Sequence, residues 1–169
     1  STMENFSTVL GKNAHEYSIY SHSFCPSISE VQYQFYNEEI ALAEAIGVGI
    51  QPFKKEVFFQ RTSVLGEEYM GEGCNVPFEE EWEVGYATGP FTIQNRYVTE
   101  DVPVGCHVYH ELGKKFGVPT PVIDSMIVLG GVMNKTDYFE SGLKLEDLGI
   151  GHMDKEALLA YLNEGVYTE

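Results

Sequence analysis

Apolar residues recur at helical spacing in several separate segments of the chain, and residues that start or stop helices bound these segments. The longest segment follows Pro26, where Ser27 and Glu30 have the spacing of a capping box, and it ends at Gly47. We therefore predict an amphipathic helix of about twenty residues here. Its apolar face consists of Ile28, Val31, Phe35, Leu42, Ala45 and Ile46.

Cap, proline and glycine signals predict further helices downstream. Thr120-Pro121 has the order of an N-cap followed by a proline in the first helical turn, and Gly117 is the predicted C-cap of the helix before it. Asp154 is predicted to cap the last helix, which Gly165 stops. The predicted spans are 52–65, 101–116, 121–133 and 155–164, with short helical turns at 78–86 and 145–148.

No convincing run of alternating strand residues and no internal repeat interrupts these helical patterns. A chain of 169 residues is one domain's worth of sequence and can bury a substantial core. We predict an all-α, multi-helix fold in a single domain, 1–169. The last helix is expected to bury Ala157, Leu158, Tyr161 and Leu162. The helix at 121–133 is expected to bury Val122, Ile123, Met126, Ile127 and Met133.

The charge and the cysteine content of the chain limit the kinds of partner and the cellular location that we expect. Ten basic and 26 acidic residues give a formal net charge of −16, which argues against a nucleic-acid or anionic-membrane partner because phosphates would be repelled. Three cysteines with no CxxC pair make a disulfide framework improbable, so we expect a cytoplasmic protein. The most apolar run, 122–133, is shorter than the roughly 20 residues that span a membrane.

The common nucleotide and metal motifs are missing from the sequence. It contains no GxGxxG after a strand, no GxxxxGK[ST] and no GxSxG, so we expect no cofactor to bind this chain by itself. His107 and His110 lie three residues apart on a predicted helix and could share a face for a metal. HEXXH is absent and no third ligand is evident nearby, so we predict two ordinary histidines, on the helix surface or partly buried, and no metal.

One segment, RYVTEDVP at 96–103, gathers charged residues at a predicted loop-to-helix junction. An arginine at the edge of a cleft commonly binds carboxylates, because its planar fork matches them in two hydrogen bonds. Arg96 is therefore a candidate for binding a carboxylate. Asp101 five residues later could be a functional carboxylate or an ordinary helix N-cap, and the residues alone leave these two interpretations balanced.

This segment and its surroundings resemble the C-terminal helical domain of the octopine/nopaline (opine) dehydrogenases. The resemblance rests on RYVTEDVP followed by LGKKFGVPTP at 112–121 and by Ile123-Asp124. It implies an all-α domain of the kind also found in 6-phosphogluconate-dehydrogenase-like reductases. RYxxEDxP argues against the related ketopantoate-type reductases. Supporting marks, which extend it over about residues 5–165, are CPSI at 25–28, the stretch 39–48, Asp137-Tyr138 and LEDLGI at 145–150.

Membership in this family would make the chain the substrate-binding and catalytic domain of an oxidoreductase. Such enzymes condense an amino acid with an α-keto acid and reduce the imine with NADH or NADPH. By resemblance, Asp101 is the catalytic aspartate that polarises a histidine, Arg96 binds the substrate carboxylate, and Trp82 is a more weakly supported pocket aromatic.

The resemblance also implies that an N-terminal Rossmann domain, which binds NAD or NADP, is absent from this chain. Residues 3–6, MENF, resemble the stretch that follows the family's catalytic histidine, which we therefore expect before residue 1. The expected partners are the two substrates and the missing Rossmann domain or polypeptide, and a homodimer is compatible with this arrangement. The chain alone is expected to be inactive. The alternative is a free-standing helical binding module that has lost catalysis.

Overall fold

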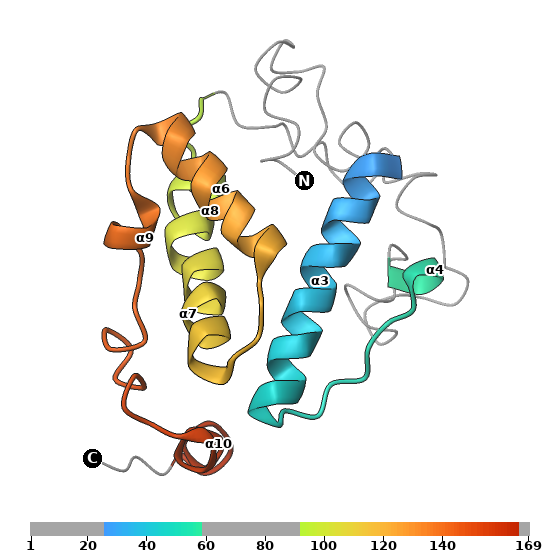
Figure 1. Cartoon of the computed structure of the whole chain (residues 1–169), viewed down its shortest axis with the longest axis vertical. Helices are drawn as coiled ribbons and strands as arrows, with labels where there is room; N and C mark the ends of the chain where they lie inside the picture. Colours follow the sequence, from blue (N-terminus) through green and yellow to red (C-terminus); the bar gives the residue numbers. More distant parts are fainter. Residues whose placement is uncertain (1–25, 59–91, 166–169) are drawn as a thin grey trace, which may run out of the picture. The chain divides into compact units, whose positions relative to one another are not determined.

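A computed structural model describes residues 26–58 and 92–165, and every regular element in these two ranges is a helix. The predicted all-α fold is therefore confirmed for the described part of the chain. Trp82 and the turns predicted at 78–86 lie outside it. The helices are α3 (Pro26–Ile46), α4 (Lys55–Phe58), α6 (Arg96–Thr99), the π-helical turn η3 (Asp101–Cys106), α7 (His107–Phe116), α8 (Pro121–Asn134), α9 (Tyr138–Ser141) and α10 (Lys155–Glu164) (Figure 1).

The chain divides into two compact units, residues 1–33 with 51–92 and residues 34–50 with 93–169. In the described part of the first unit, the Tyr33 ring packs edge-on against Phe58, with ring centroids 5.5 Å apart. Lys55 also forms an ion pair with Glu30. The described candidate residues all lie in the second unit, which the following paragraphs concern.

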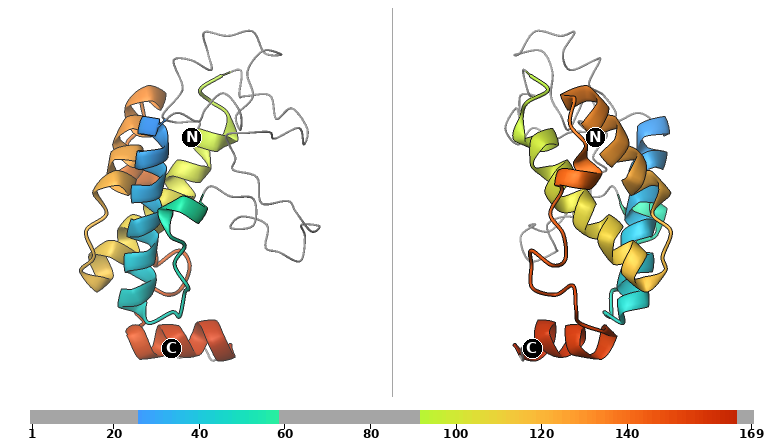
Figure 2. Two further views of the ribbon diagram at one scale, coloured as in Figure 1. Left: turned by 90° about the vertical axis from the view of Figure 1, so that its right-hand side faces the viewer. Right: turned by 60° about the vertical axis from the view of Figure 1, so that its left-hand side comes forward.

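The centre of the second unit is a rod of three successive helical pieces, α6, η3 and α7, which follow one another along the chain (Figure 2). Helical structure begins at Arg96 rather than near Asp101 as predicted, because Asn95 caps α6 by accepting a hydrogen bond from the Tyr97 amide at 3.1 Å. The sequence pattern alone did not predict this asparagine cap.

A proline sets the π-helical geometry of η3. Pro103 has no amide proton to donate, and the ladder locally shifts so that the His107 amide donates to Val102 O, five residues back. The Pro103 carbonyl is thereby released from the helix and accepts a hydrogen bond from the Leu143 amide at 2.8 Å. The π turn thus fastens the segment that follows α9 to the rod.

α8 packs against η3 and α7, and the interface forms much of the core. The predicted start of α8 at Pro121 is correct, but its capping differs from the prediction. The Thr120 hydroxyl donates to Asp124 Oδ1 at 3.0 Å and makes no cap hydrogen bond. Glu38 of α3, only 4% exposed, instead accepts from the amides of Val122 at 2.9 Å and Ile123 at 3.0 Å.

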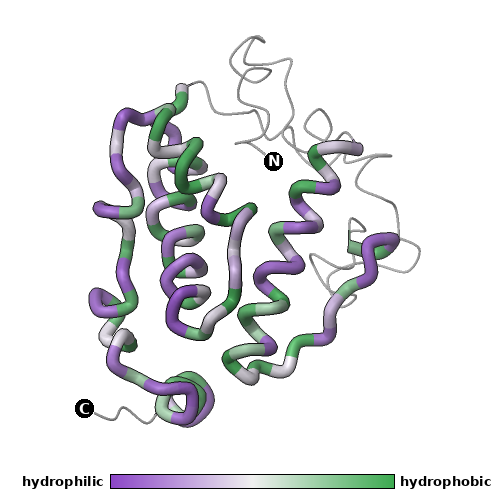
Figure 3. Tube along the Cα trace, in the orientation of Figure 1, coloured by the Kyte–Doolittle hydropathy of each residue, from purple (hydrophilic) through white to green (hydrophobic). Residues whose placement is uncertain are grey.

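Apolar residues dominate α8, as Figure 3 shows, but only some of them are buried. Ile123, Met126 and Ile127 are buried as predicted, whereas Val122 and Met133 are only half-buried. No helix in the described residues is long and apolar enough to cross a bilayer. Other buried apolar residues of this core lie in the rod and in α9. They include Val98, Val102 and Tyr138.

α10 closes a smaller cluster around Ile46, Met153 and Leu158. Its predicted cap is confirmed, since Asp154 accepts a hydrogen bond from the Ala157 amide at 2.9 Å. The predicted burial of Leu162 is wrong: its side chain is 59% exposed, and Leu159 packs against the cluster instead.

Two smaller predictions also need correction. Ser27 lies inside the first turn of α3, because the helix already begins at Pro26, so Ser27 is not the N-cap of a capping box. Residues 145–149 form a turn and not a helix. The predicted C-cap at Gly117 is confirmed, with φ at 70° and its amide donating to Gly113 O.

His107 joins the rod to the segment after α9 from inside the core. Its side chain is 1% exposed, and its Nδ1 and Nε2 lie 2.9 Å and 3.1 Å from the carbonyl oxygens of Leu143 and Phe139. A neutral imidazole has one N–H to donate and an imidazolium has two. Gly142 packs directly on the ring, which leaves no room for a larger residue there.

Replacing Gly142 with alanine is expected to lower the free energy of unfolding by about 1–3 kcal/mol through overpacking. The added Cβ would lie 2.6 Å from Cδ2 of His107, although the backbone conformation at Gly142 suits any residue. Gly105→Ala is the matched control, because a Cβ there meets nothing within 4 Å. Urea unfolding of the two variants measures the difference, and equal stabilities would contradict the proposed packing.

Candidate active site

Arg96 is the first residue of α6, and 69% of its side chain is exposed. Its Nη2 lies 3.2 Å from Oε1 of Glu100, one helical turn later. Exposed pairs at this spacing contribute about 0.3–0.5 kcal/mol, so the guanidinium can exchange Glu100 for another carboxylate at little cost. Arg96 is therefore held on the surface in a form that an anionic ligand can reach.

Asp101 is the first residue of η3 and is exposed. It does not serve as an N-cap: η3 has no side-chain cap hydrogen bond, and the cap of α6 is Asn95. Among the described residues, the Asp101 carboxylate has no recorded hydrogen-bond or ion-pair partner. The structural interpretation of Asp101 as a helix cap therefore loses its support.

The rod carries both candidate residues on its exposed surface, five positions apart, but the structure records no bond between Arg96 and Asp101. They flank the junction at Glu100, where the α-helix changes to the π-helical turn. π turns inside helices occur frequently at functional sites, because they release backbone groups and redirect side chains. Trp82, the third candidate, lies outside the described residues.

The two histidines of α7 are engaged away from Asp101. His107 is buried against two carbonyl oxygens, and His110 Nδ1 donates to Asp124 Oδ1 at 2.8 Å, since a carboxylate can only accept. His110 also packs edge-on against Phe139, with ring centroids 4.9 Å apart. His110 is partly buried, as predicted, whereas His107 is more deeply buried than the prediction of a surface or partly buried residue. The described residues hold no group of three or more side chains suited to a metal ion.

Sequence reasoning missed a polar pair on the other side of α7. The Tyr109 hydroxyl and the Glu39 carboxylate of α3 are hydrogen-bonded, and Phe35 packs edge-on against Tyr109. Burial raises the pKa of Tyr109 well above its usual value, and the nearby Glu39 carboxylate raises it further. Burial also raises the pKa of Glu39. The two residues lie seventy positions apart, and no local motif connects them.

The raised pKa of Tyr109 predicts a loss of stability in alkali. Above about pH 10 the unfolded chain releases the tyrosine proton while the folded chain retains it, so the free energy of unfolding falls as pH rises. Tyr109→Phe removes this contribution, and its stability is expected to fall less steeply above pH 10 than that of the wild type. Urea unfolding at several alkaline pH values measures the slopes. Tyr97→Phe, at an exposed tyrosine, is the control; an unchanged slope for Tyr109→Phe would contradict the assignment.

A dinucleotide cofactor does not fit the described residues. Binding of its phosphates would need a glycine-rich turn between a strand and a helix, or an open helix N-terminus. No strand occurs in residues 26–58 or 92–165, and the Glu38 carboxylate already fills the N-terminus of α8.

The sequence of this chain matches a described protein family and curated proteins. Residues 2–134 match the family described as NAD/NADP octopine/nopaline dehydrogenase, alpha-helical domain. The chain is 30% identical over 137 residues to "Opine dehydrogenase" of Arthrobacter sp. (strain 1C), a match that covers 79% of this chain and 36% of that protein. It is 28% identical over 129 residues to "Protein ocs" of Agrobacterium vitis, covering 75% of this chain and 34% of that protein.

The chain thus spans about a third of the length of the curated relatives that it matches. The family match covers most of the chain, including Arg96, Asp101, the rod and α8. The helical fold and these matches together show that the chain belongs to the octopine/nopaline dehydrogenase family and corresponds to its α-helical domain.

Proposed function

We propose that this chain is the substrate domain of an NAD(P)H-dependent opine dehydrogenase. The complete enzyme would join the amino group of an amino acid to the carbonyl carbon of an α-keto acid and reduce the resulting imine. The nicotinamide would supply the hydride from a domain outside the described residues. We propose a cytoplasmic location, which the low and odd number of cysteines supports, since it does not suit a disulfide framework.

The observation that carries the proposal is the state of Asp101. An exposed carboxylate that neither caps a helix nor pairs with a described residue is available to a second group. We propose that it accepts a hydrogen bond from an imidazole of the complete enzyme, fixing the tautomer of that ring and stabilising its protonated form. His107 and His110 cannot provide this imidazole, since both are engaged elsewhere.

Arg96 is proposed to bind the carboxylate of the α-keto acid. Clamping that carboxylate orients the carbonyl carbon for attack and reduction, and a guanidinium can do so with two parallel hydrogen bonds. In the structure, the Glu100 carboxylate contacts Arg96 at 3.2 Å and occupies one of these positions. Glu100 therefore competes with the substrate carboxylate for Arg96.

Removing the charge of Glu100 is expected to improve substrate binding. Glu100→Gln eliminates the competing carboxylate, so KM for the keto acid should fall by about twofold, the equivalent of an exposed pair worth about 0.3–0.5 kcal/mol. Glu140→Gln, which removes an exposed charge from α9, is the control. Steady-state kinetics measure both, and a raised KM for Glu100→Gln would contradict competition at Arg96.

The direct test is product formation by the protein purified from its native source with any associated polypeptide retained. Incubation with amino acids, α-keto acids and NADH or NADPH should yield secondary-amine dicarboxylates, detectable by mass spectrometry with a matching loss of reduced nicotinamide. Arg96→Gln should raise KM for the keto acid at least tenfold.

Two outcomes would contradict the proposal. No product from any amino acid and keto acid pair, with a folded protein, would favour a helical binding module without catalysis. Product formation with unchanged keto-acid KM in Arg96→Gln would retain the reaction but remove Arg96 from the site.

A further inference from the structure

The buried ring of His107 lies between two carbonyl groups of the chain that follows α8. Its Nδ1 is 2.9 Å from Leu143 O and its Nε2 is 3.1 Å from Phe139 O. Both oxygens can only accept, so a neutral ring donates to one of them. The shorter distance assigns the N–H of a neutral ring to Nδ1, with Leu143 O as its acceptor.

The backbone of Leu143 is held at both of its polar groups. Its carbonyl oxygen accepts from the His107 ring, and its amide donates to Pro103 O at 2.8 Å. Pro103 lies inside η3, two residues after Asp101. The ring of His107 is therefore linked through Leu143 to the π turn that begins at Asp101.

The Leu143 amide occupies the oxygen that an α-helical register of this turn would use. In an α-helix, the amide of His107 would donate to Pro103 O, four residues back. In η3 that amide donates to Val102 O and Val104 O instead, and the Leu143 amide binds Pro103 O. Without the Leu143 amide, Pro103 O would accept from the His107 amide again, and the α-helical register would become available.

The register of η3 decides which way Asp101 faces relative to α7. Each residue of an α-helix turns by about 100°, and a π turn contains about one residue more than an α-helical turn. A return to the α-helical register would therefore rotate Asp101 by a large part of that angle. Arg96 would move less, because Asn95 caps α6 and the buried Val98 holds α6 in the core.

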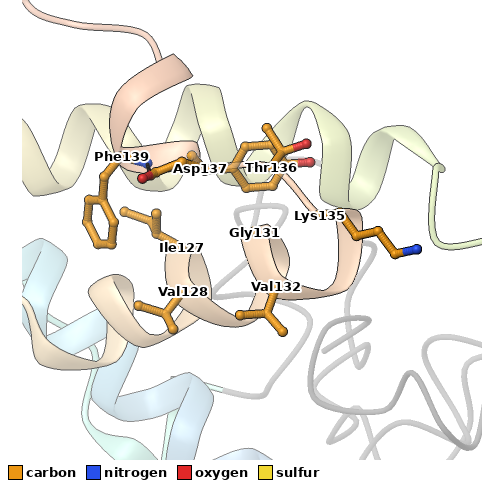
Figure 4. Close-up of a pocket in the computed structure, with 9 residues that line it drawn as sticks. Ile127, Val128, Gly131, Val132, Lys135, Thr136, Asp137 and Phe139 are labelled. Atoms are coloured by element: carbon orange, nitrogen blue, oxygen red, sulfur yellow. Dashed lines mark hydrogen bonds between the residues drawn. The ribbon is translucent and has the colours of Figure 1, made fainter.

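The chain between α8 and Leu143 borders open space on one side. A hollow of about 410 Å³ lies between α8 and residues 135–139, and the ring of Phe139 stands at its edge (Figure 4). Packing on that side does not fix this part of the chain. The contacts of its carbonyl groups with His107 and of the Leu143 amide with Pro103 restrain it against the rod.

We propose that His107 is a positioning residue for the reaction: it holds the Leu143 backbone, which keeps η3 in the π register and directs Asp101 toward the catalytic imidazole. This inference rests on the role proposed above for Asp101. At 1% exposure, His107 does not reach substrate or cofactor, and it acts only through the π turn.

Two amide substitutions separate the two contacts of His107. The side-chain nitrogen of asparagine can take the place of Nδ1 and donate to Leu143 O, whereas that of glutamine can take the place of Nε2 and donate to Phe139 O. His107→Asn therefore keeps the link to the π turn, and His107→Gln breaks it. Each variant loses one contact of a buried ring, so each is the stability control for the other in urea unfolding.

Steady-state kinetics of the complete enzyme should distinguish the two variants. His107→Gln should lower kcat by about 10–100-fold, since a misplacement of about 1 Å can cost about 100-fold. KM for the keto acid should change little, because α6 carries Arg96. His107→Asn should retain most of the wild-type kcat.

A pH profile gives a readout that a loss of stability alone would not move. An imidazole that loses its carboxylate partner releases its proton more easily, so its pKa in the profile of kcat/KM should fall in His107→Gln and in Asp101→Asn. It should stay at the wild-type value in His107→Asn. The double variant His107→Gln with Asp101→Asn should be no slower than Asp101→Asn, because both changes act on one contact.

Amide hydrogen exchange tests the link in the wild-type chain without turnover. One opening of the π turn should release the Leu143 and His107 amides together, so both should exchange at about the same slow rate. The Leu143 amide should exchange faster in His107→Gln and not in His107→Asn.

Three results would overturn the inference. These are equal kcat values for His107→Gln and His107→Asn, additive losses in the double variant, and a Leu143 amide that exchanges freely in the wild type while the His107 amide is protected. Failure of the proposed function gives a different result, because Asp101→Asn would then itself keep the wild-type kcat. If only the inference fails, Asp101→Asn is slow and His107→Gln is not.

Discussion

Replacing Asp101 with asparagine is expected to lower kcat of the complete enzyme by about 10²–10⁴-fold while leaving the fold unchanged. An aspartate that orients a catalytic imidazole holds one tautomer and stabilises the charged ring, and asparagine can do neither in the same way. KM for the keto acid should change little, because the residue proposed to bind that substrate is Arg96. Steady-state kinetics with both substrates varied measure the two parameters.

The fold should tolerate this substitution for reasons visible in the structure. Asp101 is exposed and makes no cap hydrogen bond, so asparagine leaves no buried group without a partner. Asp137→Asn is the matched control. Asp137 does cap a helix, accepting from the Phe139 and Glu140 amides, and asparagine preserves such caps. Turnover of Asp101→Asn close to that of the wild type would remove Asp101 from the catalytic mechanism.

Helix positions were largely predictable because their signals are local. The caps at Asp154, Gly117 and Gly165 act within a few residues of themselves, and the structure confirms each. Errors arose where a neighbour far along the chain decides the outcome. Leu162 has the right spacing for burial, but Leu159 packs against the cluster around Met153 instead.

The candidate site was predictable from a motif, but its local geometry was not. The motif RYVTEDVP indicated Arg96 and Asp101 as candidate residues. It did not predict the π turn, which depends on Pro103 and on the Leu143 amide forty residues away. From the sequence, a helix-cap role for Asp101 was as well supported as a functional role. Only the placement of Asn95 before the helix shows which residue performs that role.

The cap of α8 illustrates the same limit in the packing of the fold. Thr120 has the ideal position and chemistry for an N-cap, but its hydroxyl bonds to Asp124. Glu38, which is more than eighty residues earlier, takes over the helix amides. A glutamate on an amphipathic helix is ordinarily predicted to face water, and nothing in its local sequence indicates burial.

Replacing Glu38 with alanine is therefore expected to lower the free energy of unfolding by about 3 kcal/mol. Two hydrogen bonds from the amides of Val122 and Ile123 to a charged acceptor would be lost, and such bonds contribute about 1.5–3 kcal/mol each, net of their exchange with water. The favourable interaction of the carboxylate with the N-terminal end of the α8 dipole would also disappear. Urea unfolding measures the change.

Two further variants separate this capping role from general effects of charge. Glu38→Gln retains one acceptor oxygen and should lose about half as much stability as Glu38→Ala, whereas Glu44→Ala, at an exposed position of α3, should change it by less than about 0.5 kcal/mol. The loss in Glu38→Ala should persist at high salt, because ions screen a residue that is 4% exposed far less than a surface charge. A loss that vanishes at high salt, or that Glu44→Ala reproduces, would mean that Glu38 acts through the overall charge of α3 and not as the cap of α8.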